Sequence, residues 1–378
     1  MDALTTPLNW QRVRLGDILT LKHGRDYKNF KLGNIPVYGS GGYMLSINNF
    51  LHNGESVCIG RKGTIDKPIY LNGKFWVVDT LFYSYSFKKS IPKFIFYAFS
   101  IIKWSNYNEA TGVPSLTKMI ISNIEIPLPP LNEQIAIANI LSDVDRYLYS
   151  LDALILKKES VKKALSFELL SQRKRLKGFN QAWQRVRLGD IATFLKGKGL
   201  SKSQVSSNAK HECILYGELF THYDRVVTNI KSFTNIYDNP MLSLNNDVLM
   251  PSSDVTPNGL ATASCILKKG VILGGDILII RPNSNLLNGC FLAYCIVYDK
   301  NQVLSKVVGS TVYHLYAKDL KDFKILLPPL NEQIAIANIL SALDSEIISL
   351  KNKKRQFDNI KKALNHDLMS AKIRVLKK

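Results

Sequence analysis

Residues 128–142 read Leu-Pro-Pro-Leu-Asn-Glu-Gln-Ile-Ala-Ile-Ala-Asn-Ile-Leu-Ser, and residues 327–341 repeat them without a single change. A second block, Trp-Gln-Arg-Val-Arg-Leu-Gly-Asp-Ile, begins at Trp10 and again at Trp183. Each copy therefore opens with the Trp block and closes with the Pro-Pro block. A repeat of this kind identifies the chain as a tandem duplication, which predicts two domains of one fold.

The interiors of the two copies differ more than their ends. The offset between the copies is 173 residues at Trp10 and Trp183, 197 where Asp79-Thr80-Leu81 is aligned with Asp276-Ile277-Leu278, and 199 from Leu116 and Leu315 onward. Neutral drift after duplication would scatter such differences along the chain. Their concentration before Asp79 and Asp276 instead favours a common frame that carries two variable, functional surfaces.

The chain is strongly basic. Its 378 residues include 50 Lys and Arg against 30 Asp and Glu, which gives a formal net charge of +20. Such a balance favours a polyanionic partner, and nucleic acid is the first candidate. The alternative is a subunit of a protein complex whose lysines are merely solvated.

The cysteines and the apolar segments predict a cytoplasmic protein. The five cysteines are Cys58, Cys213, Cys265, Cys290 and Cys295. They lack the paired spacing of metal ligands, and their odd number argues against a disulfide framework, which indicates a reducing compartment. The longest apolar stretches, near residues 94–102 and 271–280, are too short to span a bilayer, so no membrane partner is expected.

Two long helices are predicted after Pro130 and Pro329, because a stretch without Pro or Gly follows each Pro-Pro pair. Apolar residues recur there at spacings of three and four, a narrow stripe that suits a coiled-coil seam. The stripe comprises Leu141, Val144, Leu148, Leu151, Ile155, Val161, Leu165 and Leu169 in the first helix, and Leu340, Leu343, Ile347, Leu350, Phe357, Ile360, Leu364 and Leu368 in the second. Neither helix can bury its stripe alone, so an antiparallel pair is expected.

The remaining segments alternate short apolar runs with Gly, Asn and Pro turns, which is typical of strand-rich domains. The predicted fold class is α+β, with two pseudo-two-fold related strand-rich domains separated by a pair of long antiparallel coiled-coil helices. The expected ranges are 1–127 for the first domain, 128–177 for the first helix, 178–326 for the second domain and 327–378 for the second helix.

Candidate DNA-binding residues lie in loops where basic and aromatic side chains alternate with glycine, or where polar side chains cluster. Glycine allows a close approach of the backbone, while Lys and Arg can neutralise phosphate or bind guanine. Ser is also common in ordinary turns. The candidates are Lys22, Arg25, Tyr27, Lys28, Arg61 and Lys62 in the first copy, and Lys196, Lys198, Tyr216, His222, Tyr223, Ser252 and Ser253 in the second.

The sequence contains no phosphate-binding loop, no Gly-rich cofactor loop, no Asn-Pro-Pro-aromatic motif of an amino-methyltransferase and no His/Cys cluster spaced for a metal. Isolated histidines such as His23, His222 and His314 are more often structural than catalytic. We therefore expect a non-catalytic chain that has neither a metal nor a cofactor. A nuclease that uses carboxylates such as Asp254 or Asp276 is the enzymatic alternative.

The double Leu-Pro-Pro-Leu-Asn-Glu-Gln motif, with Ile-Ala-Asn-Ile-Leu and a long helix after it and the Trp block before it, resembles the specificity subunit of Type I restriction-modification systems. The resemblance spans essentially the whole chain. Residues 35–42, Ile-Pro-Val-Tyr-Gly-Ser-Gly-Gly, also look like the recognition domains of that family, which makes Ser40 a further candidate contact with DNA. The second copy lacks this segment.

The resemblance implies that each domain is a target recognition domain for one half of a split, asymmetric site in double-stranded DNA. The helices would fix the spacing and bind two methyltransferase subunits, and restriction subunits would join this core. Methyl transfer and ATP-driven cleavage would belong to those partners. The expected partner contacts are Leu131, Glu133, Gln134, Leu330, Glu332 and Gln333. The rival hypothesis is a coiled-coil scaffold whose basic surface serves protein partners only.

Overall fold

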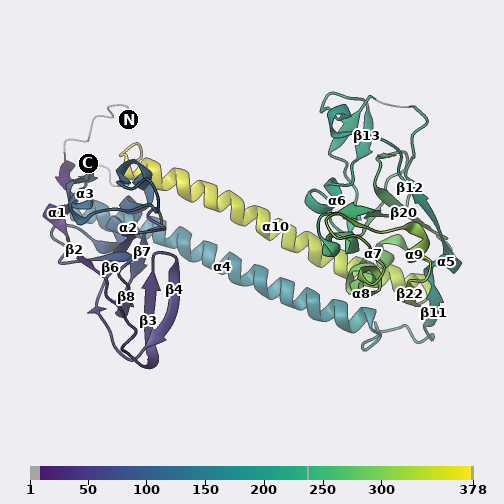
Figure 1. Ribbon diagram of the computed structural model, residues 1–378, viewed down its shortest axis with the longest axis horizontal. Coiled ribbons are helices and arrows are strands. Elements are labelled where there is room, and N and C mark those ends of the chain that lie inside the picture. The colour runs from purple at the N-terminus through teal and green to yellow at the C-terminus, as the bar shows by residue number, and fades with distance from the viewer. Residues whose placement is uncertain (1–8, 236–237, 376–378) are drawn as a thin grey trace. The chain divides into compact units, whose positions relative to one another are not determined.

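The computed structural model describes residues 9–235 and 238–375, and the chain divides into two compact units. Unit 1 comprises Met1–Asp152 and Asn352–Lys378, and unit 2 comprises Ala153–Lys351. Each unit holds one strand-rich domain and part of two 40-residue helices, α4 (Leu131–Leu170) and α10 (Leu330–Met369) (Figure 1). The α+β class expected from the sequence is confirmed. The outer ends of the expected domain ranges, at 1–8 and 376–378, lie outside the described residues.

Two four-stranded sheets and a strand pair form the domain of unit 1. The sheets have the strand orders β2-β9-β6-β7 and β4-β3-β8-β5, and β1 pairs with β10. Helix α2 packs on β6 and β7 and buries Phe94, Tyr97 and Phe99 in the main core of the unit. The elements are β1 (Gln11–Arg14), α1 (Leu15–Ile18), β2 (Thr20–His23), β3 (Leu32–Gly39), β4 (Gly42–Ile47), β5 (His52–Asn53), β6 (Ser56–Gly60), β7 (Ile69–Leu71), β8 (Lys74–Val77), β9 (Leu81–Tyr85), α2 (Pro92–Ile101), η1 (Trp104–Tyr107), α3 (Lys118–Asn123) and β10 (Glu125–Leu128).

The domain of unit 2 has a five-stranded sheet of order β12-β20-β16-β18-β14, a three-stranded sheet β15-β13-β19, and the pairs β11-β22 and β17-β21. Helix α7 packs on β16 and β18 and is buried from Gly289 to Ile296. The elements are β11 (Gln184–Arg187), α5 (Leu188–Ile191), β12 (Ala192–Lys196), η2 (Lys202–Gln204), β13 (His211–Ile214), α6 (Glu218–Thr221), β14 (Val226–Val227), β15 (Ser232–Thr234), β16 (Asp247–Pro251), β17 (Ser253–Asp254), η3 (Pro257–Ala261), β18 (Ser264–Ile266), β19 (Ile272–Leu273), β20 (Ile277–Pro282), α7 (Gly289–Tyr298), α8 (Lys300–Leu304), β21 (Tyr313–His314), α9 (Ala317–Leu320) and β22 (Lys324–Leu327).

Strand pairing aligns the two domains residue by residue. Thr20 and Thr193 follow the repeated Trp block at the same offset of 173, and they pair with Tyr85 and Arg281. Tyr85 and Arg281 are thus equivalent, and the offset in this strand is 196 residues. The expected offset of 197 is wrong here, because it rested on a shared Asp in a loop whereas main-chain pairing sets the register. The counterpart of Asp276 is Thr80, and not Asp79.

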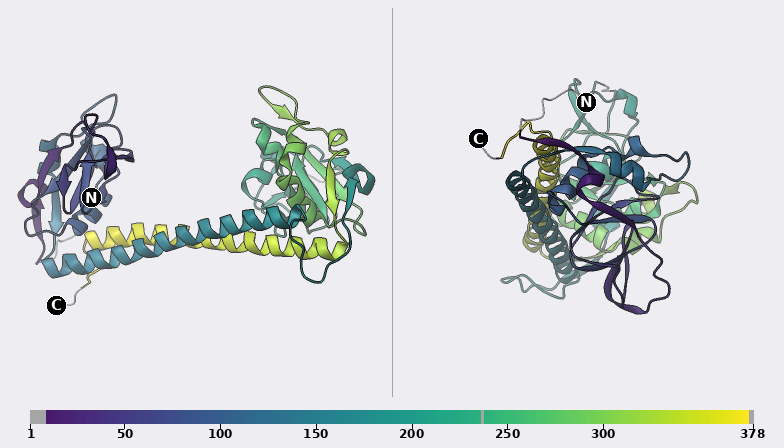
Figure 2. Two further views of the ribbon diagram at one scale, coloured as in Figure 1. Left: turned by 90° about the horizontal axis from the view of Figure 1, so that it is seen from below. Right: turned by 90° about the vertical axis from the view of Figure 1, so that its left-hand side faces the viewer.

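Helices α4 and α10 begin directly after the Pro-Pro pairs and lie side by side in each unit (Figure 2). In unit 1, Asp145 forms an ion pair with Lys361, and Asp152 forms one with Lys354. The order along α10 is opposite to the order along α4, so the two helices are antiparallel there. In unit 2 the ion pairs of Lys158 with Glu346 and of Lys162 with Asp344 show the same direction.

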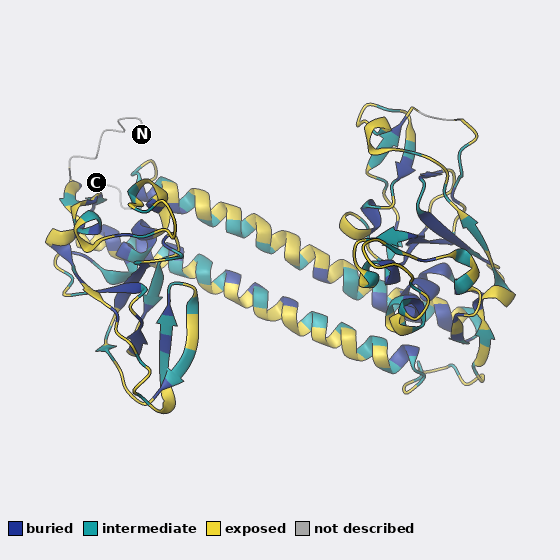
Figure 3. Ribbon diagram, viewed as in Figure 1, coloured by how far each residue is buried: buried dark blue, intermediate teal, exposed yellow. Residues whose placement is uncertain are grey.

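The predicted stripe is mostly buried or half-buried, with two exceptions (Figure 3). Val161 is 39% exposed and Ile360 is 51% exposed, so their assignment to the seam is wrong. Each lies beside a lysine that takes the contact instead, since Lys162 pairs with Asp344 and Lys361 with Asp145. Neighbouring residues point about 100° apart on a helix. Turning the lysine toward the other helix therefore turns Val161 or Ile360 outward.

The expectation that no segment could span a bilayer needs one correction. Within the residues that the structure describes, α10 is long and apolar enough to cross a membrane by length and composition alone, with a mean hydropathy of 1.3 over its most apolar stretch. Core helices of soluble proteins have the same length and composition, so these properties are weak evidence for membrane insertion.

Candidate nucleic-acid interface

One end of the sheet β2-β9-β6-β7 in unit 1 carries three loops. Both β2 and β6 run antiparallel to β9, so both end where β9 begins. The loops at this end contain residues 24–28, 61–63 and 79–80, and we call them the rim of unit 1. Five of the seven candidates in this unit lie on the rim, namely Arg25, Tyr27, Lys28, Arg61 and Lys62. Lys22 lies within β2, with its Nζ 4.7 Å from the centre of the Tyr85 ring.

A cleft of about 810 Å³ opens beside the rim of unit 1. Its walls include Tyr27 and Lys28 of the rim and Ser40 of the turn between β3 and β4, whose backbone N donates to Thr80 Oγ1 at 3.3 Å. The other wall residues are Asp26, Gly39, Gly41, Gly42, Tyr43, Met44, Val78, Asp79 and Thr80. Polar, charged and aromatic side chains around a glycine turn can contact the edge of a base or a phosphate.

Arg61 is held at the rim from three sides. Its backbone N donates to Thr80 O at 2.7 Å, and its backbone O accepts from Leu116 N at 2.9 Å. Its side-chain Nε donates to Asp79 O at 2.5 Å, and its Nη2 lies 3.5 Å from Asp79 Oδ2. The Arg61 side chain is 27% exposed, so it is positioned by the fold and still accessible to a ligand.

The glycines on either side of Arg61 and Lys62 have structural reasons. A Cβ at Gly60 would collide with the backbone O of Thr64, and Gly63 has a φ of +83°. A positive φ is accessible to glycine at little cost. These two residues therefore allow the sharp loop that presents Arg61 and Lys62.

The rim of unit 2 consists of the equivalent loops, residues 197–198, 252–254 and 275–276. Ser252 N donates to Asp276 O at 2.8 Å, and Leu315 N donates to Ser252 O at 3.0 Å, which repeats the backbone bonds of Arg61. Ser253 is paired with His314 in the way that Lys62 is paired with Ser115. Matching positions are thus held by Arg61 and Ser252, by Lys62 and Ser253, and by Arg25 and Lys198.

The side chains on the rim of unit 2 have a different chemistry. Ser252 is only 7% exposed, and its Oγ donates to Asp276 Oδ1 at 3.3 Å. Lys196 Nζ lies 3.6 Å from the same carboxylate oxygen, while Lys198 Nζ donates to Asn239 O at 3.0 Å. The same backbone frame therefore presents an arginine in unit 1 and a nearly buried serine in unit 2.

The candidates Tyr216, His222 and Tyr223 lie in and around helix α6, which follows β13. The last residue of β13, Ile214, accepts from Gly274 N, the residue before the third loop of the rim of unit 2. Tyr216 and His222 are exposed, and His222 Nδ1 lies 3.4 Å from the buried Glu218. Tyr223 packs against the core, and its hydroxyl accepts from Lys231 N at 3.1 Å. Burial raises the pKa of Tyr223 to about 12.

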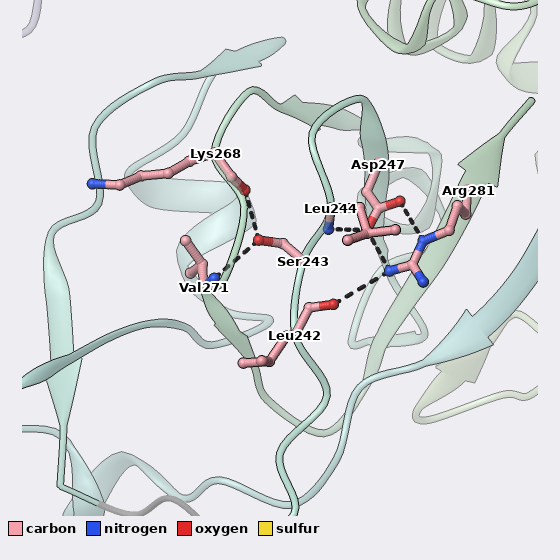
Figure 4. Close-up of polar contacts among 7 residues, drawn as sticks. All are labelled: Leu242, Ser243, Leu244, Asp247, Lys268, Val271 and Arg281. Carbon is pink, nitrogen blue, oxygen red and sulfur yellow. Dashed lines mark hydrogen bonds and ion pairs between the residues drawn. The ribbon is translucent and has the colours of Figure 1, made fainter. Parts of the chain in front are cut away.

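Asp247 and Arg281 form a polar cluster at the opposite end of the β16–β20 strand pair (Figure 4). Arg281 donates to both carboxylate oxygens of the fully buried Asp247, at 2.8 Å each, and Leu244 N donates to the same carboxylate. The carboxylate raises the pKa of Arg281. A buried, bidentate ion pair between neighbouring strands is a structural element, so this cluster is separate from the rim.

The predicted partner contacts Glu133, Gln134, Glu332 and Gln333 are buried, and their polar atoms are occupied within this chain. Glu133 accepts from Trp10 Nε1 at 3.0 Å and from Arg374, and Glu332 accepts from Trp183 Nε1 at 3.0 Å and from Arg175. Gln134 bonds Ile91 N and the carbonyls of Lys89 and Pro129, and Gln333 bonds Asn288 N and the carbonyls of Leu286 and Pro328. Bonds within this chain therefore explain why these four polar side chains are buried, and no contact with a partner subunit is needed to explain it. Leu131, in contrast, is 51% exposed, and Leu330 is half-buried.

Sequence reasoning missed one tyrosine in each domain that bonds the domain to a long helix. Tyr97 of α2 donates to Asp145 at 2.6 Å in unit 1, and Tyr294 of α7 donates to Asp344 at 2.7 Å in unit 2. Burial and the adjacent carboxylate raise the pKa of both hydroxyls. Both the tyrosines and the aspartates recur at the same place in each copy, so a search for polar identities outside the repeated blocks could have found them.

Among the residues that the structure describes, no group of three or more His, Cys, Asp or Glu could hold a metal ion. The five cysteines are free and buried.

The structure thus defines a duplicated α+β protein whose two domains present different side chains on equivalent rims. The sequence matches the family described as "Type I restriction modification DNA specificity domain" over residues 7–158 and again over 180–357, so the chain belongs to that family. The resemblance found in the repeated blocks is confirmed.

Curated relatives and solved structures agree with this assignment. The chain is 26% identical to the Type I restriction enzyme MjaVIII specificity subunit of Methanocaldococcus jannaschii, over 99% of this chain and 95% of the relative. It is 24% identical to the putative specificity subunit S.HindORF215P of Haemophilus influenzae, over 83% of this chain and 81% of the relative. The fold is similar to that of the Type I restriction-modification S subunit from M. genitalium, with a TM-score of 0.70, 18% identity and 97% coverage of both chains.

Proposed function

We propose that this specificity subunit reads a bipartite, asymmetric site in double-stranded DNA, with one half bound at each rim. Residues 1–127 and 178–326 would be its target recognition domains. The observation that carries the proposal is the equivalence of the rims, since the same backbone positions hold Arg61 and Lys62 in one domain and Ser252 and Ser253 in the other. Different side chains on one frame suit the reading of two different half-sites. The net charge of +20 would supply affinity for the phosphate backbone.

The other candidate residues would have different roles in DNA binding, according to how exposed their side chains are. Arg25, Lys28, Lys62, Lys196 and Lys198 would contact phosphates, because their side chains are exposed. Tyr27 and Ser40 would contact a base or sugar in the cleft. The proposed DNA contacts of the second domain also include Tyr216 and His222. Tyr223 and Ser252 would instead stabilise the loops of this domain through their hydrogen bonds to Lys231 and Asp276.

The helices, within residues 128–177 and 327–378, would set the distance between the half-sites. Their antiparallel ion pairs and buried stripe support a stiff connection. Inserting seven residues into α4 after Ala153 and seven into α10 after Asn352 would keep the heptad phase and add about 10.5 Å. The spacer between half-sites should then grow by about three base pairs. An unchanged spacer would refute this role of the helices.

Two methyltransferase subunits would bind at the repeated blocks. The two blocks are identical even at exposed positions, including Leu131 and Ile135 in α4 and Ile334 in α10. Exposed apolar residues that are the same in both copies suit one kind of partner bound twice. Methyl transfer from S-adenosylmethionine would belong to that partner. Restriction subunits would join the assembled complex and supply ATP-driven cleavage, all in the cytoplasm.

The test uses this chain with the methyltransferase subunits of its system in a host without DNA methylation. Methylome sequencing should find a split, asymmetric methylated motif that is missing when the methyltransferase is expressed alone. An assembled, active complex without a new motif would instead favour the coiled-coil scaffold. Metal-dependent cleavage by the isolated chain, lost in Asp254→Ala, would favour the nuclease.

A further inference from the structure

One position where the rims of the two units differ is occupied by Arg61 in unit 1 and by Ser252 in unit 2. The backbones there are held alike. Arg61 N donates to Thr80 O and Ser252 N donates to Asp276 O, each in the rim loop just before β9 or β20, and the carbonyls of Arg61 and Ser252 accept from Leu116 N and Leu315 N. Only the side chains differ. The frame is therefore constant while the group presented to a ligand changes.

The Arg61 guanidinium is fixed in a way that leaves its planar outer edge open. A guanidinium has five N–H donors in a rigid fork. Nε is used by the Asp79 carbonyl at 2.5 Å, and Nη2 faces the Asp79 carboxylate at 3.5 Å. Within residues 9–235 and 238–375, no hydrogen bond is assigned to Nη1. The Nη1 and Nη2 edge is the part that can donate two parallel bonds.

The surroundings of Arg61 favour a base over a phosphate as the ligand. Asp79, which is 70% exposed, lies beside the guanidinium and would repel a phosphate. The same carboxylate can accept from an exocyclic amino group, as cytosine N4 offers in the major groove, while an arginine fork matches the O6 and N7 acceptors of guanine. Arg61 and Asp79 together present donors next to an acceptor. A G·C pair presents the complementary pattern.

We infer that Arg61, positioned by Asp79, reads a guanine of a G·C pair in the half-site of the first recognition domain. The inference rests on the proposed reading of a bipartite DNA site by the two rims. The second domain cannot read its half-site from the equivalent position, because Ser252 is 7% exposed and already donates to Asp276. The two half-sites are thus read from different positions of one frame.

The experiment selects DNA from a random library with the purified complex of this chain and its methyltransferase subunits. Wild type should select a split motif that contains a fixed G·C pair in one half. Arg61→Ala should relax that pair alone, lowering the preference for guanine by about 10-fold to 100-fold, while the other half stays unchanged. The unchanged half shows that the variant is folded and assembled.

Two further variants separate base reading from charge. Arg61→Lys keeps the charge but loses the fork, so it should relax the same pair nearly as much as Arg61→Ala. Arg12→Ala removes an exposed arginine, 3.9 Å from Glu125 in the β1–β10 pair, and should leave the motif unchanged.

The outcomes distinguish the inference from the proposed function. A wild-type complex that selects no split motif would overturn both. A split motif that Arg61→Ala leaves intact, relaxes at an A·T pair, or weakens equally in both halves would overturn the role of Arg61 and leave the proposed function standing.

Discussion

Arg374 Nε donates to Glu133 Oε1 at 2.7 Å, although the two residues are 241 positions apart in the chain. The carboxylate also accepts from Trp10 Nε1, so the Trp block, the start of α4 and the segment after α10 meet at one buried acid in unit 1. In unit 2, Glu332 accepts in the same way from Arg175 and Trp183. The repeated Glu is therefore the point where each unit joins its two helix ends to its domain.

The first prediction concerns the stability of this junction. Glu133 is 2% exposed and Arg374 is 30% exposed. Replacing Glu133 with Ala would leave a partly buried arginine and an indole N–H without their acceptor. The free energy of unfolding of unit 1 should fall by about 2–3 kcal/mol, somewhat less than for a fully buried pair. Denaturant unfolding followed by tryptophan fluorescence would measure it.

A matched control for this variant is Glu125→Ala. Glu125 is 46% exposed and lies 3.9 Å from Arg12 and 4.0 Å from Arg14. Exposed ion pairs contribute about 0–1 kcal/mol, so the control should shift the transition little. Equal losses for Glu125→Ala and Glu133→Ala would contradict the structural role given to Glu133.

The second prediction concerns alkaline pH. Burial and the Asp344 carboxylate raise the pKa of Tyr294 above its ordinary value of about 10. The folded state thus keeps a proton that the unfolded state loses above pH 10. The stability from this group is complete below pH 10 and is lost as the pH rises further. At pH 11 the loss should be about 1.4 kcal/mol relative to pH 8.

Tyr294→Phe would isolate that contribution. The variant should be less stable than wild type at pH 8, by about 1 kcal/mol for the lost hydrogen bond. The difference should shrink or reverse at pH 11, because Phe has no proton to lose. Unfolding midpoints at the two pH values would measure this, and Tyr97→Phe would repeat the test in unit 1. A difference between wild type and variant that does not change with pH would contradict the shift.

The sequence predicted the elements with strong periodic or repeated signals. The antiparallel helices, the α+β class and the loop position of Arg61 and Lys62 all follow from the Pro-Pro blocks, the apolar stripe and the glycines. The burial of Glu133 could not be predicted from the sequence. A repeated Glu at the start of a helix can equally bind a partner subunit or pair with a distant arginine of the same chain. Its ion-pair partner Arg374 lies 241 residues away in the chain, and no local sequence pattern links the two residues.

The candidate site was predicted as separate loops rather than as one surface. Glycine and lysine patterns located the loops, but strand pairing decides that 24–28, 61–63 and 79–80 meet at one end of a sheet. In the sequence Asp79 serves only to align the two copies, and the structural counterpart of Asp276 is Thr80. Composition and spacing cannot predict roles that depend on strand register, such as the positioning of Arg61 by Asp79.

The third prediction concerns the stoichiometry of the proposed complex. Ile135 is 49% exposed and Ile334 is 37% exposed, at identical positions in the repeated blocks. An aspartate at the centre of an apolar contact would be desolvated without a partner, which costs several kcal/mol. Ile135→Asp should therefore lower the mass of the purified complex by one methyltransferase subunit, and the double variant with Ile334→Asp by two. Native mass spectrometry would count the subunits.

Leu156→Asp is the control for that loss. Leu156 is 64% exposed on α4, and the residue at its place in the second copy is Arg355, so it is not part of the repeated surface. Its variant should keep both methyltransferase subunits. Full assembly of the double isoleucine variant would show that the repeated blocks are not the binding surface.

The fourth prediction separates phosphate contacts from base contacts at the rim of unit 1. Lys62 is exposed and sits next to Arg61, and a lysine acts as a point charge on a flexible stem without the geometry to select a base. Lys62→Ala should weaken binding to all DNA sequences alike. The slope of log affinity against log salt should fall in magnitude by about 0.9, the value for one phosphate contact on duplex DNA. Lys88→Ala, an exposed lysine beyond β9 and away from the rim, should leave the slope unchanged. A change in the selected motif for Lys62→Ala, with the salt slope intact, would mean that Lys62 reads a base and that the division of roles between Arg61 and Lys62 is wrong.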